Sequence, residues 1–293
     1  MSLLGCPPMQ LSVVLPCYNE GRNVARAVRE AAQAASSVAG SYEIVVVDDG
    51  STDDTSRVAE SLRDEIPEVV VVRHVHNRGY GAALRSGFRA ARYDWVFYTD
   101  GDGQFDSRQL TDLRHALGRD VVAGYRSPRR DGSWQRTLLG RAWTGLTNAV
   151  LDLGIRDTNC AFKVFPKTLL DAIPMHSKGA AIDAEILAEA RRRGWSITQV
   201  PVQHRPREHG SATGARPTVM ALAMLELGLI ALRQSAAAAS DASDPDSVPD
   251  PDSVPDPDSD PDFASASASA SASASASASG QGHTRLRPLR FAS

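Results

Sequence analysis

The sequence predicts an α/β protein whose mostly parallel sheet is flanked by helices, and two observations carry this prediction. Short apolar runs alternate with segments whose apolar residues recur at helical spacing between residues 11 and 126. Such alternation is typical of a parallel sheet with helices on both faces. The unbroken apolar run Ile44–Val47 agrees with it, because a strand covered on both faces shows no polar alternation.

The expected elements follow one another in chain order. A strand at 11–16 (LSVVLP) precedes a helix at 19–35. A strand at 42–50 (YEIVVVDDG) precedes a helix at 51–65 that begins with the capping residue types Ser51, Thr52 and Asp53. Three more strands are expected at 68–74, 94–100 and 120–126, with helices at 80–93 and 107–118 between them. These elements predict a sheet whose strand ends share one edge.

The chain divides into three parts by composition. Residues 1–9 form a short extension, residues 10–234 carry the predicted α/β domain, and residues 235–293 consist largely of an acidic Pro/Asp repeat and an Ala/Ser repeat. Neither repeat offers apolar side chains to bury, so we expect this tail to be disordered. The acidic tail leaves the body mildly basic, although the whole chain has a formal net charge of −3.

Composition also bears on location and partners. The small net charge gives no signal for nucleic-acid binding. Three widely spaced cysteines predict neither a disulfide framework nor a zinc site, and no signal peptide is evident. The apolar segment Val219–Leu232 is interrupted by Glu226 and is shorter than the roughly 20 residues of a membrane span. We therefore expect a cytoplasmic protein, with peripheral contact at the cytoplasmic face of a membrane as a further option.

Polar and acidic residues follow each expected strand. Ligands of parallel α/β sheets bind at the carboxyl ends of the strands, so the predicted site comprises the segments 16–20, 48–53, 77–81, 100–104 and 124–126. Asp48–Ser51 could instead be a turn with a helix cap, and Asn77–Gly81 a turn before a helix. Neither a dinucleotide-binding glycine motif nor a phosphate-binding P-loop follows a strand.

Asp100 and Asp102 lie one residue apart at the end of an apolar strand. Two neighbouring carboxylates raise each other's pKa unless a positive partner is present. Mg²⁺ or Mn²⁺ would be such a partner, because these hard cations prefer oxygen ligands and often share them with substrate phosphates. The motif therefore predicts a divalent-cation site, and a solvated loop is the alternative.

The motifs VVLPCYNE, VVVDDGSTDDT, NRGYGAALRSGF and DGDGQFD, in this order and spacing, resemble the inverting glycosyltransferases of family 2, which have the GT-A nucleotide-sugar fold. The later segments AGYR, DTNCAFKVF and VPVQHRPREHGSATG resemble one branch of that family, the dolichyl-phosphate or polyprenyl-phosphate mannosyl- and glucosyltransferases. The resemblance covers residues 10–232 and excludes the tail. It implies a metal-dependent enzyme that moves mannose or glucose from a GDP-mannose or UDP-glucose type of donor to polyprenyl phosphate.

The resemblance also implies roles for residues that match the family's motifs. Pro16, Tyr18 and Glu20 resemble its base- and ribose-binding segment, and Val47 and Asp49 its second nucleotide contact. Asp100, Gly101 and Asp102 resemble its D-x-D motif, with Gln104 in the metal shell, so Asp100, Asp102 and Gln104 are the expected ligands of Mg²⁺ or Mn²⁺. Arg126 resembles an arginine that closes on phosphate, and Arg207 the basic residue of an R-x-x-G segment.

The chain departs from the family pattern after Arg207. Ala212 and Thr213 stand where that pattern has serine and lysine. The missing lysine leaves open how the acceptor or the diphosphate is contacted, with Arg205 or Arg216 as the candidates to supply the charge.

The acceptor decides whether the reaction needs a general base. The oxygen of a lipid phosphate is already ionised near neutral pH, because its second pKa is about 6. A sugar hydroxyl would need a base, for which Asp157, Asp183 and Glu185 are the catalytic candidates. Asp183 and Glu185 have a structural alternative as acidic residues in the first turn of a helix.

Two segments could bring the protein to a membrane. The basic stretch 127–136 and the helix after it carry Trp134 and Trp143, which are expected to be exposed and could rest on an anionic surface. A solvated basic face is the alternative. For the helix at 216–233, packing of its apolar face into the core is the favoured interpretation.

Two other functions stay open at this point. One is a glycosyltransferase that acts on a soluble or cell-envelope sugar hydroxyl, and the other is a non-catalytic module that binds a nucleotide sugar. The intact pair Asp100 and Asp102 favours an enzyme, because a binding module has little need of two carboxylates that repel each other.

Overall fold

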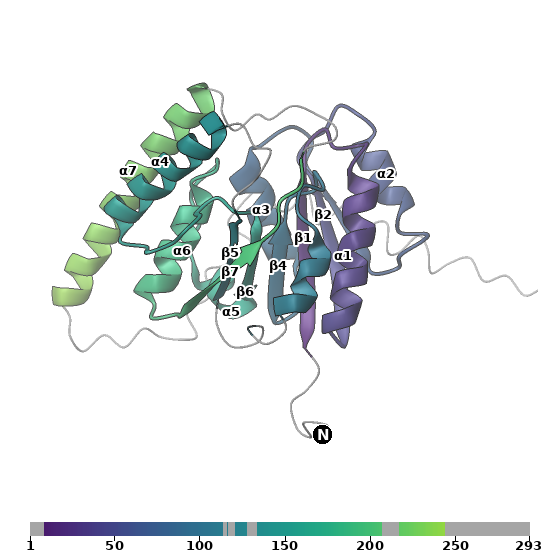
Figure 1. Ribbon diagram of the computed structural model, residues 1–293, viewed down its shortest axis with the longest axis horizontal. Helices are drawn as coiled ribbons and strands as arrows, with labels where there is room; N and C mark the ends of the chain where they lie inside the picture. Colours follow the sequence, from purple (N-terminus) through teal and green to yellow (C-terminus); the bar gives the residue numbers. More distant parts are fainter. Residues whose placement is uncertain (1–8, 114–115, 117–120, 128–133, 207–216, 244–293) are drawn as a thin grey trace, which may run out of the picture.

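A computed structural model describes residues 9–113, 116, 121–127, 134–206 and 217–243. Seven strands within them form one sheet in the order β3-β2-β1-β4-β6-β5-β7 (Figure 1). The strands are β1 Gln10–Cys17, β2 Ser41–Asp48, β3 Val69–Arg73, β4 Trp95–Thr99, β5 Val121–Arg126, β6 Phe162–Pro166 and β7 Ile197–Val202. Neighbouring strands are parallel, except that β6 runs antiparallel to β4 and β5. The predicted mostly parallel sheet is confirmed.

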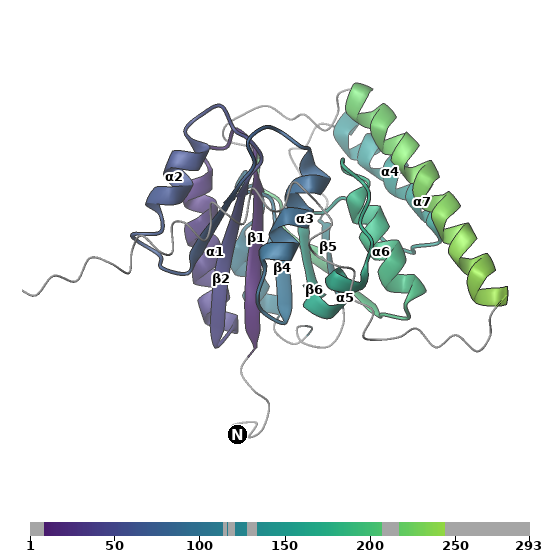
Figure 2. The same cartoon turned by 180° about the vertical axis from the view of Figure 1, so that it is seen from behind.

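Helices cover both faces of this sheet. They are α1 Val24–Val38, α2 Thr55–Ser61, α3 Tyr80–Ala90, the 3-10 helix η1 Ser107–Leu113, α4 Trp134–Leu151, α5 Lys167–Ala172, α6 Ile182–Arg192 and α7 Pro217–Ser243. α1 and η1 pack together on the face seen in Figure 1, and Figure 2 shows α3, α5 and α6 on the opposite face. α4 and α7 lie side by side at one end of the molecule and contact α6.

The apolar strands at the centre of the sheet form the core. Val13, Val14, Leu15 and the run Ile44–Val47 have no exposed surface, as expected of strands covered on both faces. α3 approaches β1 so closely that a Cβ atom at Gly87 would lie 2.3 Å from Cγ1 of Val14. The missing side chain at Gly87 therefore permits the close packing of this helix on the sheet.

The strand register brings three segments of the predicted site together. Pro16 of β1 pairs with Val47 of β2, and Val14 pairs with Tyr98 of β4, so the three strands end at the same edge. The N–H of Gly101 donates to the carbonyl of Pro16 at 3.3 Å. This bond ties the segment after β4 to the end of β1, as the alignment of parallel strands predicts.

Several elements differ from the prediction. α1 begins at Val24 rather than at residue 19. The helix expected over 107–118 is a 3-10 helix, η1, over Ser107–Leu113, and residues 114–115 and 117–118 of that prediction lie outside the described residues. Of the three predicted capping residues, it is Asp53 whose Oδ1 accepts the N–H of Thr55 at 2.9 Å. β6 is not predicted at all, because a charged Lys163 stands in its short sequence FKVFP. The strand is nevertheless fully buried, since the charge of Lys163 has a partner from elsewhere in the chain.

The apolar segment near the C-terminus forms a longer helix than the sequence predicts. α7 continues to Ser243, past the predicted start of the tail at 235, because Ala236–Ala239 favour a helix. By length and composition, Pro217–Ala237 could cross a membrane, so the prediction of too short a segment is wrong. Residues 244–293, the rest of the predicted tail, lie outside the described residues.

α7 has both a buried and an exposed apolar side. Its buried side packs on the body of the protein through Ala223, Leu227 and Ile230, which confirms the predicted core packing. The exposed side, which the sequence analysis does not anticipate, carries Leu222, Met224, Leu225, Leu229 and Leu232.

Candidate active site

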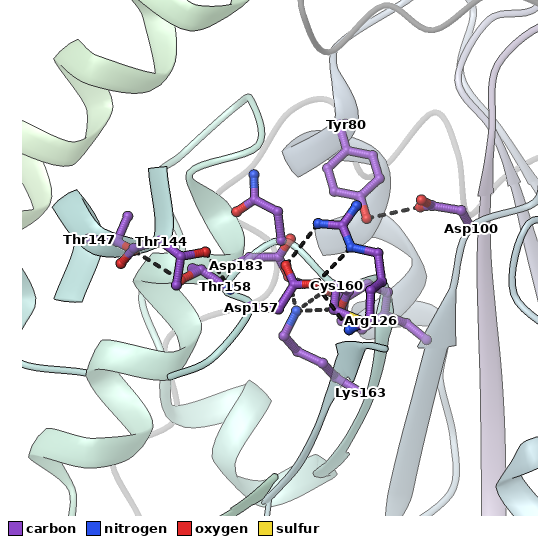
Figure 3. A network of polar contacts seen from close by, with 12 residues as sticks. Tyr80, Asp100, Arg126, Thr144, Thr147, Asp157, Thr158, Cys160, Lys163 and Asp183 are labelled. Atoms are coloured by element: carbon purple, nitrogen blue, oxygen red, sulfur yellow. Dashed lines mark hydrogen bonds and ion pairs between the residues drawn. The ribbon is translucent and has the colours of Figure 1, made fainter. Parts of the chain in front are cut away.

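Two carboxylates directly after β4 form the acidic centre of the site. Asp100 accepts a hydrogen bond at Oδ1 from the hydroxyl of Tyr80 at 3.0 Å (Figure 3). Asp102 is buried, and its Oδ1 accepts the N–H of Gln104 at 2.9 Å. Burial, followed by the charge of Asp100, raises the pKa of Tyr80 well above its usual value. The phenol therefore keeps its proton and acts as the donor to Asp100.

The thiol of Cys17 shows how negative this edge of the sheet is. Burial raises the pKa of Cys17 most, and the charges of Glu20, Asp48, Asp100 and Asp102 raise it further. Four carboxylates from the ends of three strands therefore act on one point at the end of β1. Such a concentration of negative charge favours a bound cation.

The oxygen donors at this edge fit a hard cation that the substrate helps to hold. Among the described residues, no three His, Cys, Asp or Glu side chains gather into a metal cage. Asp100 and Asp102 offer carboxylate oxygens, which are the ligands that Mg²⁺ and Mn²⁺ prefer and often share with phosphates. Gln104 is buried next to them, and its Nε2 donates to the carbonyl of Arg205 at 3.1 Å.

The residues predicted to bind the nucleotide divide into two groups. Tyr18 is 44% exposed, and Glu20 lies half-buried beside it after β1, so a ligand can reach both. Pro16 is buried and contributes its carbonyl to the Gly101 N–H. Val47 is fully buried in the core, so its side chain offers no contact to a nucleotide.

Asp49 lies beneath the rim of the site rather than on it. Its carboxylate is buried and accepts the N–H groups of Arg78 and Gly79, both at 2.9 Å. The same carboxylate lies 2.6 Å from Nδ1 of His74, whose Nε2 lies 2.9 Å from Oγ of Ser86. Asp49 therefore fixes the residues before α3 instead of facing a nucleotide. No motif around His74 or Ser86 could have revealed this contact from sequence.

Arg126 and Asp157, predicted separately as a phosphate ligand and a base, bind each other. Nε and Nη2 of Arg126 donate to the two carboxylate oxygens at 2.7 and 2.8 Å (Figure 3). Burial alone would lower the pKa of Arg126 and raise that of Asp157, but their mutual hydrogen bonds and charges outweigh it in both cases. Asp157 is therefore held as a carboxylate, with a pKa below its usual range, which makes it a weak base.

Asp183 and Glu185, the other candidate bases, are buried in the first turn of α6. Asp183 accepts a hydrogen bond from the ammonium of Lys163 at 2.9 Å (Figure 3). It also accepts one from the hydroxyl of Tyr98. Glu185 accepts N–H groups from the loop before α6 at 2.8 to 3.1 Å. The first-turn position agrees with the structural alternative. Asp183 is bonded to buried side chains, whereas Glu185 is bonded to backbone N–H groups and lies 3.7 Å from the guanidinium of Arg233.

The guanidinium of Arg205 binds carboxylates of the protein itself. Nη1 lies 2.9 Å from Glu30 and Nη2 lies 2.5 Å from Asp106, so a phosphate would compete with these carboxylates for Arg205, as it would with Asp157 for Arg126. The phosphate-binding role of Arg205 stays a prediction. The other residues named for that role or for the departure from the family pattern, Arg207, Ala212, Thr213 and Arg216, lie outside the described residues. Their contribution stays a prediction.

A cavity of about 510 Å³ lies beside the acidic centre. Polar side chains that follow the strand ends line one part of it, and α4 and α7 form an apolar wall. The polar part includes Gln104, Arg126, Asp157 and His204, and the apolar wall includes Leu139, Trp143, Leu146, Val219, Met220 and Met224. No local sequence pattern reveals this cavity, because its walls come from α4 and α7, which are far apart in the chain.

Of the two tryptophans expected at the surface, the structure describes the side chain of Trp143, which is not exposed as predicted. Trp143 is half-buried against the core, and its indole N–H donates to Asn159 at 2.8 Å. The side chain of Trp134 and residues 128–133 lie outside the described residues. The predicted basic, aromatic surface is therefore wrong for Trp143, which forms part of the cavity wall instead.

The sheet order and the acidic edge define a protein of the GT-A type, and solved structures share this fold. Mannosyl-3-phosphoglycerate synthase from Rubrobacter xylanophilus superposes with a TM-score of 0.58 at 22% identity, over 78% of this chain and 75% of that one. Glucosyl-3-phosphoglycerate synthase from Mycobacterium tuberculosis, in complex with Mn²⁺, UDP-glucose and phosphoglyceric acid, gives a TM-score of 0.55 at 23% identity, over 75% and 80%.

The chain belongs to glycosyl transferase family 2, whose model matches residues 12–173. Glycosyltransferase AglD from Haloferax volcanii is 34% identical over 68% of this chain and 34% of its own length. Undecaprenyl-phosphate 4-deoxy-4-formamido-L-arabinose transferase from Edwardsiella ictaluri is 33% identical over 69% of this chain and 62% of its own. Dolichyl-phosphate beta-glucosyltransferase from Trichomonas vaginalis is 30% identical over 66% and 65%. The chain thus spans between about a third and two thirds of these relatives.

Proposed function

We propose that this chain is a divalent-cation-dependent inverting glycosyltransferase that moves a hexose from a nucleotide sugar to a polyprenyl phosphate. One observation carries the proposal: the acidic centre at Asp100 and Asp102 adjoins a cavity with Arg126 on its polar side and an apolar wall. A nucleotide sugar needs the first feature and a lipid phosphate needs the second. Family membership and relatives named as undecaprenyl- and dolichyl-phosphate sugar transferases support this assignment.

The donor would lie over the ends of β1 and β4. Tyr18 and Glu20 are the accessible residues there, so they are proposed to contact the nucleoside. Both GDP-mannose and UDP-glucose types of donor fit this open edge. The structural neighbour crystallised with UDP-glucose supports the uridine type.

Asp100 and Asp102, with Gln104 beside them, would hold Mg²⁺ or Mn²⁺ together with the diphosphate of the donor. When bound, the cation supplies positive charge that stabilises the leaving diphosphate. The protein prepares this site through two hydrogen bonds: Tyr80 orients Asp100, and the N–H of Gln104 orients Asp102. The neighbour crystallised with Mn²⁺ supports a divalent cation.

The acceptor phosphate is proposed to enter the cavity at its polar side, where the planar guanidinium of Arg126 suits phosphate oxygens. The first isoprene units would then lie against α4 and α7. An acceptor oxygen attacks the anomeric carbon as the bond from that carbon to the diphosphate breaks, and the bonding electrons leave with the nucleoside diphosphate. Attack from the side opposite the leaving group inverts the configuration of the sugar.

This reaction needs no general base, because a phosphate monoester has a second pKa of about 6 and its oxygen is ionised near neutral pH. The structure supports a base-free mechanism, since each of the three predicted bases is engaged elsewhere. Arg126 holds Asp157, Lys163 holds Asp183, and backbone N–H groups hold Glu185. A sugar-hydroxyl acceptor would have to displace one of these partners.

The exposed leucines of α7 support contact with a membrane that carries the acceptor. Leu225 and Leu232 are 63% and 69% exposed, and Leu138 of the adjacent α4 is 59% exposed. These exposed side chains belong to α4 and α7, the two helices that also line the cavity, so a bilayer at this surface would bring a lipid phosphate close to Arg126. We propose peripheral contact with the cytoplasmic face, where nucleotide sugars are available.

The proposal is tested by incubating the protein with Mn²⁺, a panel of labelled UDP- and GDP-sugars, and undecaprenyl phosphate in vesicles. Label should become extractable into organic solvent with one or a few donors. Asp100→Asn and Asp102→Asn should each lower the transfer rate at least about a hundredfold while circular dichroism stays unchanged, because each change removes an oxygen ligand and a charge from the cation site. Full transfer in excess chelator would refute the cation.

A further inference from the structure

We propose that Glu226 of α7 is a positioning residue that sets the contact between Tyr80 and Asp100 through the loop at 177–179. Seating of α7 on the protein would thereby be coupled to binding of the donor. The inference rests on the proposed donor site at Asp100 and Asp102, and it assigns a role to a buried carboxylate that the mechanism itself does not use.

Glu226 holds this loop from the side of α7. Glu226 is 7% exposed and interrupts the apolar segment Val219–Leu232 of α7. Its Oε1 accepts the N–H of Lys178 at 2.7 Å and that of Gly179 at 3.1 Å. A buried carboxylate is costly unless hydrogen bonds compensate it, so its burial depends on the position of these two N–H groups.

The same loop holds the start of α3 from its other side. The carbonyl of Lys178 accepts the N–H of Gly81 at 2.8 Å, and the carbonyl of Ser177 accepts Nη1 of Arg85 at 2.6 Å. The loop lies so close to the start of α3 that a Cβ at Gly81 would be 2.3 Å from the carbonyl oxygen of Ser177. Gly79 has φ +96°, and a Cβ there would lie 2.7 Å from the Lys178 oxygen. Lys178 therefore links α7 and α3 through its own N–H and carbonyl groups.

Tyr80 stands between these two glycines and donates to Asp100. Its backbone position is fixed on one side by the loop at 177–179 and on the other by Asp49, which holds the N–H of Gly79. A shift of the loop would move the first turn of α3 and with it the hydroxyl that orients Asp100. Interdigitated backbone contacts of this kind transmit a displacement because they leave no free volume to absorb it.

α7 also supplies part of the wall of the cavity. Met220, Ala223 and Met224 line the cavity and lie within two helical turns of Glu226. An acceptor that presses on these side chains acts on the helix that carries Glu226. The contacts thus connect the proposed acceptor cavity with the proposed donor site by one continuous path.

The first test measures the affinity of UDP and of GDP, each with Mn²⁺, by calorimetry. Glu226→Ala should lower the affinity for the nucleotide about threefold to tenfold. This is the range expected for a residue that couples two sites without touching the ligand. Glu226→Gln keeps one acceptor oxygen, so its nucleotide affinity should lie between those of wild type and Glu226→Ala. Gly228→Ala is the matched control on the same helix, because a Cβ there meets no atom within 4 Å, and it should bind like wild type.

The second test needs neither metal nor nucleotide. Hydrogen exchange should be faster in Glu226→Ala at the amides of Lys178, Gly179 and Gly81, and unchanged in Gly228→Ala. If Glu226→Ala does not fold, Glu226→Gln supplies both measurements, because it preserves the helix and the volume of the side chain.

The double variant separates positioning from general stability. If Glu226 acts through Tyr80, then Tyr80→Phe with Glu226→Ala should bind nucleotide no more weakly than Tyr80→Phe alone. Additive losses would overturn the proposal, as would wild-type affinity and wild-type exchange in Glu226→Ala. Failure of the wild type to bind either nucleotide would instead refute the donor site, and the exchange data would still decide whether Glu226 holds the loop.

Discussion

The buried ion pair of Lys163 and Asp183 illustrates how single residues hold the site together. The ammonium of Lys163 is fully buried and donates to Asp183 at 2.9 Å, to the carbonyl of Cys160 at 2.6 Å and to the hydroxyl of Tyr98 at 3.1 Å. The four-carbon side chain of Lys163 is long enough for the ammonium to reach these partners while the backbone of β6 stays paired in the sheet. Removing one partner of such a pair leaves an uncompensated charge, which is far costlier than the pair itself.

Asp183→Asn should therefore lower the free energy of unfolding by about 3–5 kcal/mol in urea titration. Asp171→Asn is a suitable control, because Asp171 pairs with Lys167 at the surface and its loss should cost less than about 1 kcal/mol. A stable Asp183→Asn protein that binds nucleotide normally but transfers no sugar would show that Asp183 is a general base after all.

The ion pair of Arg126 and Asp157 should make the free energy of unfolding depend on pH. The pKa of Asp157 in the folded protein lies below its usual range. Its contribution to the free energy of unfolding is therefore complete above about pH 4, the pKa of an unfolded aspartate, and is lost as the pH falls through the folded pKa. Asp157→Asn should thus cost about 1–2 kcal/mol at pH 7 and at pH 5, and less below pH 4. Thermal unfolding at several pH values measures this difference. A difference that stays constant down to pH 2 would contradict the ion pair.

At the scale of elements, the packing of α3 on β1 depends on the absence of a side chain at Gly87. Gly87→Ala would place a methyl group 2.3 Å from Val14, so it should destabilise the fold by about 1–3 kcal/mol in urea titration. Gly140→Ala in α4 has open space around its Cβ and should be neutral or stabilising. Equal effects of the two substitutions would show that α3 can move away from the sheet at little cost.

The elements that sequence predicts and those it misses differ in the range of their contacts. The strands from β1 to β5 follow from local apolar patterns, and the acidic edge follows because parallel strands end together. β6 and the roles of Asp49 and Asp183 depend on partners up to 85 residues away in the chain, such as Tyr98 for Asp183, which no local pattern contains. The cavity was missed for the same reason, since it forms only when α7 packs beside α4.

In the whole molecule, the acidic centre at Asp100 and Asp102 and the apolar helices α4 and α7 belong to one fold built on a single sheet. The acidic centre follows β4 in the middle of the sheet order, and α4 and α7 stand at one end of the molecule (Figures 1 and 2). The cavity is lined by residues of α4 and α7 and by Gln104, which lies two residues after Asp102. For the proposed substrates, this arrangement would separate a water-soluble donor from a lipid acceptor while bringing their reactive ends together. The exposed leucines of α7 lie at the end where a membrane would have to be.

In the proposed reaction, the acceptor is a lipid phosphate bound between the acidic centre and α7. The most direct measurement compares sugar transfer to undecaprenyl phosphate by wild type, Met220→Trp and Ala221→Trp. Met220 lines the cavity, whereas Ala221 is exposed on the same helix. Met220→Trp should fill the cavity and slow transfer to undecaprenyl phosphate at least about tenfold, and Ala221→Trp should transfer like wild type. Equal transfer by all three proteins, or transfer by wild type to water-soluble acceptors alone, would contradict the account.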